Sequence, residues 1–425
     1  MRKFYCSVLV TAILGFAAGC GSGSGSTPVG VPPSGSNILS IAVDGGPVSG
    51  VNYQDAAFAS AKICAPSTST CVTVDHLLVD TGSVGIRVLA SALGTLSLPV
   101  TTDGSGNNLN DCVQFVDTSY LWGQVESADV TLSGEVASNI PIHVLADPTG
   151  FAIPSTCNTG GPDEDTLASL GTNGILGVAP EPVDCLSCDQ SISGLSVPPT
   201  GVYYLCSSSS CQSAFVPEAN QVVNPVVTFP LDNNGVIVEL PAPTSANAAS
   251  LTGSLIFGIG TQSNNALGSA TAFALDTSDN FTTVFPATNG QTLTASFIDS
   301  GSNGLFFPDS ATDVPVVQCS DTGVAPSYYC PASTQALSAQ NLGANGASGT
   351  VSFNVDNAEN LFNNDSSDAV MQNLAGSNGI GTCAAGSGQC SFDWGLPFFY
   401  GRNVYTAIDG QAVPSTAPPA PWWAY

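Results

Sequence analysis

Two short stretches of similar sequence constrain the fold of this chain more than any other feature. Leu78–Ser83 reads Leu-Val-Asp-Thr-Gly-Ser, and Phe297–Ser302 reads Phe-Ile-Asp-Ser-Gly-Ser. Each places one aspartate in a small polar turn directly after a hydrophobic run that is typical of a buried strand. Asp80 and Asp299 lie 219 positions apart, and both turns are followed by Gly and then an aliphatic residue at matching positions. The matched flanks predict a duplicated molecule in which each half supplies one aspartate.

Length and composition favour two β-rich halves. The chain has 425 residues, more than one ordinary domain, and 43% of them are hydrophobic, which is enough for two cores. Its 45 Gly and 29 Pro favour many short strands and turns over helices. We therefore expect a mainly β fold with an N-terminal lobe at 38–245 and a C-terminal lobe at 246–425. The boundary is placed in the loose, small-residue-rich segment Pro241–Ser250.

The charge balance excludes some partners. The chain has 32 acidic residues and 5 basic ones, for a formal net charge of −27. Such a surface repels nucleic acid and anionic membranes, so neither is expected to bind it. The acidity fits a solvated exterior, or tolerance of low pH, where protonated carboxylates would leave little charge. We expect the protein to act as a monomer.

The N-terminus predicts export. Met1–Lys3 is positively charged, and Phe4–Ala18 is apolar but short for a membrane span. The segment ends in Phe-Ala-Ala-Gly-Cys, which resembles a bacterial lipobox, so residues 1–19 are interpreted as a lipoprotein signal peptide and Cys20 as the lipidated residue. Ala17 stands where lipoboxes usually have Leu, so ordinary cleavage with release is the alternative.

Residues 20–37 form a Gly/Ser/Pro-rich tether that would hold the folded part away from a membrane. The membrane is then contacted only through the lipid anchor. By analogy with bacterial lipoproteins, Gly21 rather than Asp after the cysteine fits sorting to the outer membrane if the cell is Gram-negative. The predicted location is therefore an exported bacterial lipoprotein at the outer membrane, the cell surface or the periplasmic face.

The cysteines also indicate an oxidising compartment. Beyond Cys6 and Cys20 there are twelve, an even number, mostly in close pairs. Local disulfides are the simplest arrangement, namely Cys64/Cys71, Cys185/Cys188, Cys206/Cys211, Cys319/Cys330 and Cys383/Cys390, with Cys112 and Cys157 left for each other. A metal site at Cys185-x-x-Cys188 is disfavoured because His76 and His143 are the only histidines. We expect all six pairs to be structural, and no metal or cofactor.

Short hydrophobic runs predict further elements. Strands are expected at Ile38–Val43, Thr73–Val79 and Ile140–Leu145, and a short helix at Leu89–Leu93. Cys112–Val116 and Val125–Val130 suggest a hairpin with the aromatic-rich tip Asp117–Gly123. A second hairpin is expected from Val226–Phe229 and Val236–Leu240. Ala336–Gly349 and Asn360–Gly376 are interpreted as surface insertions, in part helical.

The paired turns resemble those of pepsin-like aspartic peptidases, in which each lobe supplies an Asp-Thr/Ser-Gly-Thr/Ser turn. Each lobe of that family also threads its turn past a later segment of two hydrophobic residues and Gly. Ile175–Gly177 and Phe399–Gly401 match this pattern, 97 and 102 positions after the respective aspartates. The resemblance implies a bilobal pepsin-like fold. The motif Phe-Asp-Trp-Gly-Leu-Pro-Phe-Phe at Phe392–Phe399 also resembles an exported bacterial family of unknown function.

The resemblance assigns Asp80 and Asp299 as the catalytic pair. Two carboxylates within a few ångströms share a proton because both cannot ionise cheaply. The ionised one would activate a water, and the protonated one would polarise the peptide carbonyl. The residues that would support the pair, by close backbone approach and by hydroxyl hydrogen bonds, are Thr81, Gly82, Ser83, Ser300, Gly301 and Ser302. The alternative is that both are Asx-type turns without chemistry.

Two features depart from the family pattern. Active pepsins usually carry Trp seven residues after the first aspartate, where this chain has Arg87. Arg87 would pair with a carboxylate, lower the pKa values of the aspartates or select an acidic substrate, or else face outward from a strand. No aromatic residue aligns cleanly with the family's flap tyrosine; of Phe115, Tyr120 and Trp122, we choose Tyr120. His76 and His143 are expected to be structural.

Two main functional hypotheses follow. In the first, the chain is an exported aspartic endopeptidase that hydrolyses peptides or proteins in a cleft between the lobes. In the second, it is a catalytically silent surface lipoprotein of the same fold that binds partners or acts as a scaffold. A third, an unrelated β-rich adhesin, requires the two turns to be coincidental.

Overall fold

The computed structural model describes residues 35–425 except 116–117, 147–149, 208–209, 289, 309–315, 365–366 and 379–389. The predicted signal peptide, Cys20 and most of the tether lie outside the described residues. At the end of the predicted tether, Asn37 is buried, and its side chain donates to the Phe257 carbonyl at 3.0 Å. No helix in the described part of the chain is long and apolar enough to cross a membrane.

The described fold is mainly β, as the composition predicts. The strands of the N-terminal half and the junction are β1 (Ile38–Val43), β2 (Ala57–Cys64), β3 (Cys71–Asp80), β4 (Val84–Leu89), β5 (Asn108–Gln114), β6 (Tyr120–Leu132), β7 (Glu135–Leu145), β8 (Gly174–Val178), β9 (Tyr203–Ser207), β10 (Ser210–Ser213) and β11 (Gly235–Leu240). Those that follow are β12 (Asn247–Ala248), β13 (Leu251–Phe257), β14 (Ala272–Ala274), β15 (Phe281–Phe285), β16 (Gln291–Ile298), β17 (Leu305–Phe307), β18 (Gln335–Leu342), β19 (Ser348–Val355), β20 (Val370–Met371), β21 (Ala375–Ser377), β22 (Asp393–Trp394), β23 (Arg402–Ala407) and β24 (Trp422–Ala424).

The helices are short. They are α1 (Ala90–Leu93), α2 (Leu167–Leu170), α3 (Gln190–Ser193) and α4 (Ala358–Asn364), with 3₁₀ turns η1 (Leu186–Cys188), η2 (Glu218–Asn220), η3 (Pro225–Thr228) and η4 (Leu396–Phe398). The helix predicted at Leu89–Leu93 is α1. The strands predicted at Ile38–Val43, Thr73–Val79 and Ile140–Leu145 are confirmed within β1, β3 and β7.

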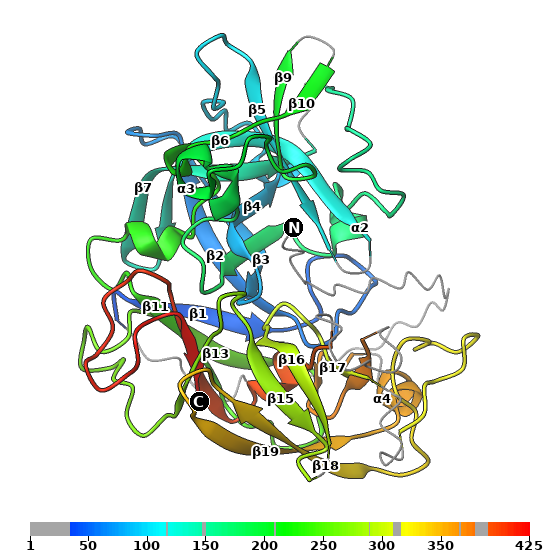
Figure 1. Cartoon of the computed structure of the whole chain (residues 1–425). Coiled ribbons are helices and arrows are strands. Elements are labelled where there is room, and N and C mark those ends of the chain that lie inside the picture. The colour runs from blue at the N-terminus through cyan, green and yellow to red at the C-terminus, as the bar shows by residue number, and fades with distance from the viewer. Residues whose placement is uncertain are drawn as a thin grey trace.

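The two halves of the chain share one sheet. Its order is β10-β9-β5-β6-β7-β4-β8-β3-β2-β1-β13-β11-β23-β24-β14, and a second sheet has the order β19-β18-β15-β16-β22-β17-β21. β1 pairs antiparallel with β13, from Ile38 opposite Ile256 to Val43 opposite Leu251, and β11 pairs with both β13 and β23. Figure 1 shows β1, β11 and β13 where the two halves meet. The start, middle and end of the chain therefore join the halves through backbone hydrogen bonds.

The same three-strand unit occurs once in each half. In the first, β8 lies between β3, to which it is parallel, and β4, to which it is antiparallel. In the second, β22 lies between β16, to which it is parallel, and β17, to which it is antiparallel. In both units, the turn that carries the aspartate joins the two outer strands. This repetition confirms the internal duplication.

The predicted threading segment of the second half is wrong. The strand that passes between β16 and β17 contains Asp393 and Trp394 and is followed by Gly395, whereas Phe399–Gly401 follows η4 and lies against β11. A Cβ at Gly177 would meet the backbone of Ser83, and one at Gly395 that of Ser302, so these glycines are equivalent. Gly395 lies 96 positions after Asp299, closer to the 97 of the first half. The pattern failed because this segment carries Asp393 where a hydrophobic residue was required.

Three other segments differ from expectation. Val226–Phe229 is not a strand: η3 begins at Pro225, and the Asn224 side chain accepts from the Val226 amide at 3.2 Å. Ala336–Gly349 is not a surface insertion, because it forms most of β18 and the start of β19, which pair together. Asn360–Gly376 includes the end of α4 and the fully buried Val370 and Met371. In the last two segments the tertiary environment overrides a local composition of small or polar residues, and at Val226–Phe229 it overrides a β-branched and aromatic one.

Apolar cores lie behind both turns. In the first half, Val79, Ile86 and Leu176 of β3, β4 and β8 are fully buried. In the second, the core is aromatic: the rings of Phe392 and Trp394 stack with centroids 4.0 Å apart. Packing at interior density holds the strands rigid, so the ends of β3 and β16 are fixed in space.

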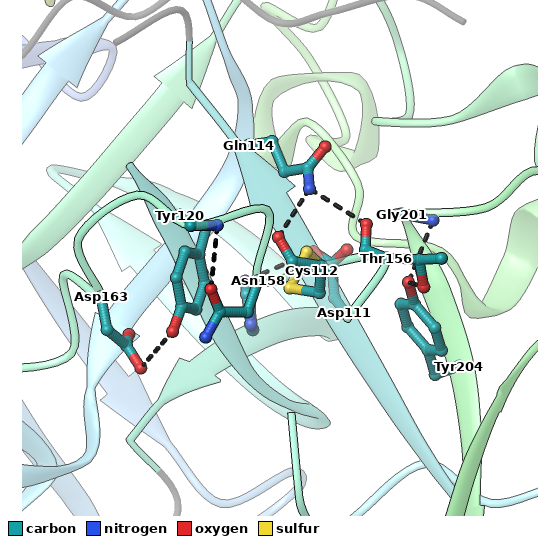
Figure 2. Close-up of a disulfide and its surroundings, with 12 residues drawn as sticks. Asp111, Cys112, Gln114, Tyr120, Thr156, Asn158, Asp163, Gly201 and Tyr204 are labelled. Carbon is teal, nitrogen blue, oxygen red and sulfur yellow. Dashed lines mark hydrogen bonds and ion pairs between the residues drawn. A yellow bond between two sulfur atoms is a disulfide. The ribbon is translucent and has the colours of Figure 1, made fainter. Parts of the chain in front are cut away.

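Five of the six predicted disulfides are formed: Cys64–Cys71, Cys112–Cys157, Cys185–Cys188, Cys206–Cys211 and Cys319–Cys330. The sixth involves Cys383, which lies outside the described residues. Figure 2 shows the bridge between Cys112 and Cys157, which spans 45 positions and ties β5 to the loop before α2. Disulfides of this number are typical of proteins in oxidising compartments.

Candidate active site

The structure brings Asp80 and Asp299 together at the junction of the two halves. β3 ends at Asp80, β16 ends just before Asp299, and both side chains are fully buried. A Cβ at Gly82 would lie 2.7 Å from the carboxyl carbon of Asp299, and one at Gly301 would lie 2.7 Å from Oδ1 of Asp80. Each turn therefore places its glycine against the carboxylate of the other turn, where a larger residue leaves no space.

Each carboxylate is held by its own turn in the same way. The Gly82 amide donates to Asp80 Oδ1 at 2.8 Å, and the Gly301 amide donates to Asp299 Oδ1 at 2.7 Å. The Ser83 hydroxyl donates to Asp80 Oδ2, and the Ser302 hydroxyl lies 2.8 Å from Asp299 Oδ2. Both oxygens of each carboxylate therefore have a donor in their own turn.

Thr81 and Ser300 lock the two turns together. The Thr81 amide donates to Ser300 Oγ at 3.1 Å, and the Ser300 amide donates to Thr81 Oγ1 at 2.9 Å. Their hydroxyls in turn donate to backbone carbonyls of the opposite strands, Thr81 to Ile298 at 3.1 Å and Ser300 to Val79 at 2.7 Å. All four bonds join residues more than two hundred positions apart. They fix the separation of the two carboxylates.

The electrostatics of the pair favour a retained proton. Burial raises the pKa of Asp299 well above that of an ordinary carboxyl group, and the nearby charges of Asp80 and Asp393 raise it further. Two carboxyl groups in such contact titrate as one system. Among the described residues, no group of three or more His, Cys, Asp and Glu side chains is arranged to hold a metal ion.

Asp393 is a further residue at this site that the sequence motifs do not predict. It lies on β22 and is 3% exposed, and its Oδ2 is 2.7 Å from the Ser302 hydroxyl that also contacts Asp299. A signal was present, since Asp393 is the one charged residue in the apolar motif Phe392–Phe399. Its proximity to the pair depends on the pairing of β22 with β16, which the misplaced threading segment hid.

Arg87 is buried in a cluster of its own. Its guanidinium donates to Asp111 Oδ2 at 2.6 Å and to Asp184 Oδ2 at 3.1 Å, and it lies 2.8 Å from His143 Nδ1. The prediction that Arg87 pairs with a carboxylate is confirmed, and the alternative of an outward-facing strand residue is wrong, because Arg87 is 2% exposed. The described contacts of this side chain do not include Asp80 or Asp299.

Burial also shifts the pKa values of the groups around Arg87. Desolvation and the charge of Asp111 raise the pKa of Asp184 to about 8. Desolvation lowers the pKa of His143 to about 3, so its ring is neutral and Nδ1 accepts from Arg87. The buried His143 ring therefore contacts Arg87 within this cluster, as a structural residue would. His76 is half-buried beside Asp44, with Nε2 3.5 Å from the carboxylate.

Tyr120 does not lie at a loop tip. It is the first residue of β6 and is buried, and its hydroxyl donates to Asp163 Oδ2 at 3.1 Å (Figure 2). Its ring belongs to a cluster with Cys112, Cys157 and Tyr204. The predicted tip Asp117–Gly123 is wrong for this reason: its last four residues form the start of β6. The contacts described for Tyr120 are with this cluster, and its role as a flap stays a prediction.

One hollow adjoins the second turn, and a larger cavity lies beside Arg87. A small one of about 40 Å³ lies beside the second turn and is lined by Gly301, Asn303, Tyr53 and Phe58, among others. A cavity of about 830 Å³ lies on the Arg87 side, with walls from both halves that include Glu181, Asp184, Leu195, Asp276 and Pro421, and neither aspartate of the pair lines it. Asp80 and Asp299, in contrast, face each other with matching amide and hydroxyl donors in the described structure.

Replacement of the glycines tests the close approach of the two turns. We expect Gly82→Ala and Gly301→Ala each to lower the free energy of unfolding by about 1–3 kcal/mol, since an added methyl group collides with a buried carboxylate. The control is Gly104→Ala, where a Cβ meets nothing within 4 Å. Urea unfolding of the oxidised protein measures the difference. Equal stability of all three variants would contradict the geometry.

No relative was found among curated proteins. Among solved structures, the chain is similar to the crystal structure of an aspartic proteinase from Irpex lacteus, with 17% identity, a TM-score of 0.49, and coverage of 87% of this chain and 93% of that one. A family model described as "Protein of unknown function (DUF3443)" matches residues 33–425. Because the match extends over nearly the whole chain, the protein belongs to the DUF3443 family.

Proposed function

We propose that this protein is an aspartic-type endopeptidase whose catalytic pair is Asp80 and Asp299. The observation that carries the proposal is the arrangement of two buried carboxylates, each held by its own turn and locked together by Thr81 and Ser300. A merely structural Asx turn needs only local hydrogen bonds. It does not need a second carboxylate brought against it from the other half of the chain.

The chemistry follows from the shared proton. With one proton on the pair, a water bound between the inner oxygens would lose a proton to the ionised carboxylate and attack the peptide carbonyl. The protonated carboxyl would donate a hydrogen bond to the carbonyl oxygen as negative charge develops there. The tetrahedral intermediate would then collapse as the pair returns a proton to the leaving amine. No cofactor or metal takes part in this scheme.

The substrate is an extended peptide or protein segment that lies across the two turns. The hollow lined by Tyr53 and Phe58 reaches Gly301 of the second turn and would receive a small side chain. The disulfides and the N-terminal sequence support export to the bacterial cell envelope, with a lipid at Cys20 as the membrane contact. The strongly negative charge argues against nucleic acid as a partner. We propose that the enzyme acts as a monomer.

The test is cleavage of an unfolded polypeptide by the purified, oxidised protein between pH 3 and pH 7. We expect new termini, detected by mass spectrometry, with the wild type and not with Asp80→Asn. Asp75→Asn is the control, because it makes the same substitution at an exposed position of the same strand. Cleavage by Asp80→Asn at the wild-type rate, or no cleavage at any pH, refutes the proposal. Peptide binding without cleavage would favour the silent binding or scaffold protein.

A further inference from the structure

Asp393 lies directly behind the catalytic pair, and the scheme above leaves it without a role. It pairs with β16 at Phe297, two residues before Asp299. In the first half, the equivalent position is Ile175, which lies opposite Leu78, two residues before Asp80. The duplicated unit therefore has an apolar residue in one copy and a carboxyl group in the other.

The Ser302 hydroxyl has two short contacts with carboxyl groups, one to Asp299 and one to Asp393. The Ser302 hydroxyl lies 2.8 Å from Asp299 Oδ2 and 2.7 Å from Asp393 Oδ2. A hydroxyl has one hydrogen to donate, and an ionised carboxylate can only accept. Both short contacts are hydrogen bonds only if one of the two carboxyl groups carries a proton and donates it to Ser302.

The surroundings place that proton on Asp393. Its Oδ1 is buried without a hydrogen-bond partner, whereas Asp299 Oδ1 accepts from the Gly301 amide. An ionised carboxylate with an unsatisfied oxygen is costly in an apolar interior, and a neutral acid is far less so. After burial, the groups that act on Asp393 are Ser302, whose hydrogen bond lowers the pKa of Asp393, and the charge of Asp80, which raises it. The Asp299 carboxyl group lies on the other side of the Ser302 hydroxyl. Burial raises the pKa of Asp393 well above its usual range.

We propose that Asp393 is a positioning residue: as a neutral acid it donates to Ser302, so that the Ser302 hydroxyl is committed to the outer oxygen of Asp299. The proposal rests on the proposed function, because it concerns the same catalytic pair. Loss of the proton from Asp393 at higher pH would turn the Ser302 hydroxyl toward Asp393 and place a further negative charge beside the pair. Asp393 therefore sets the upper pH limit of activity.

Two substitutions at Asp393 test its hydrogen-bond donation and its ionisation separately. Asp393→Asn keeps a side-chain donor of the same shape and cannot ionise, so we expect acid-pH activity within about 3-fold of the wild type and an upper pH limit raised by about one unit or more. Asp393→Ile copies the first half and removes the donor, so we expect kcat to fall by about 10-fold or more, with KM little changed. Superimposable pH profiles of Asp393→Asn and the wild type would overturn the proposal, as would equal losses in both variants.

The protonation of Asp393 can be measured without activity. If Asp393 is neutral in the folded protein at pH 6, unfolding ionises it, because an unfolded aspartate has an ordinary pKa. The pH dependence of unfolding then shows about one proton more released by the wild type than by Asp393→Asn. Equal proton release in both proteins would overturn the proposal. If the wild type cleaves nothing, the proposed function fails together with the role of Asp393 in turnover, while the proton count still decides whether Asp393 is neutral.

Discussion

Asp80→Asn and Asp299→Asn are each expected to lower kcat/KM for peptide cleavage by about 10³-fold or more while the protein stays folded. An amide cannot take a proton from water, and it cannot share a proton with the remaining carboxylate. The two groups act as a unit, so the double variant should lose little more than either single variant. Steady-state kinetics on one peptide substrate, with Asp75→Asn as the matched control, measure these effects.

Stability distinguishes loss of chemistry from loss of fold in these variants. The pair has no cation among the groups that shift the pKa of Asp299, so its negative charge is uncompensated. Removal of one carboxylate relieves this repulsion, and we expect the Tm of Asp299→Asn to be equal to or higher than that of the wild type. A large drop in Tm would mean that the lost activity reports unfolding. A single variant that keeps more than a tenth of wild-type activity would contradict the assignment of the pair.

Arg87→Met is expected to lower the free energy of unfolding by about 3–5 kcal/mol, the largest effect on stability that we predict. Removal of the guanidinium leaves the fully buried Asp111 carboxylate without its cation, and a broken buried ion pair typically costs this much. Lys62→Met is the control: Lys62 is exposed on β2, so loss of the same charge there should cost less than about 1 kcal/mol. Urea unfolding near pH 6, under non-reducing conditions, compares the two.

A double-mutant cycle identifies the source of the Arg87 effect. Asp111→Asn in the Arg87→Met background removes the stranded charge, so it should restore part of the lost stability. If the double variant is as unstable as the sum of the single variants, the pair does not interact and the account is wrong. Because the described contacts of Arg87 include neither Asp80 nor Asp299, folded Arg87 variants should keep the wild-type pH profile of cleavage. A shifted pH profile would support the hypothesis that Arg87 lowers the pKa values of Asp80 and Asp299.

The parts of the site that lie within a few consecutive residues could be predicted from the sequence. An aspartate, a small hydroxyl residue, Gly and Ser in four consecutive positions define each turn, because the same turn must supply the amide and hydroxyl donors of its own carboxylate. The short-range disulfides were predictable for a similar reason, since their cysteines are close in the chain. The strand that threads the second turn was not, because Asp393 interrupts the hydrophobic pattern that identified its counterpart Ile175.

A duplicated, mainly β chain with one aspartate turn in each half could be predicted from the amino-acid pattern, because period-2 hydrophobicity and local turn chemistry are properties of consecutive residues. The partners that lie across strands follow from the folded arrangement and not from the local pattern. That arrangement places Arg87 with Asp111 and Asp184, and Asp393 behind Asp299. A strand pattern predicts which side chains of the strand are buried, but the groups that they meet depend on pairing with other segments, here 24 to 97 positions away. The pair of aspartates could therefore be predicted from the sequence, and the position of Asp393 beside Asp299 could not.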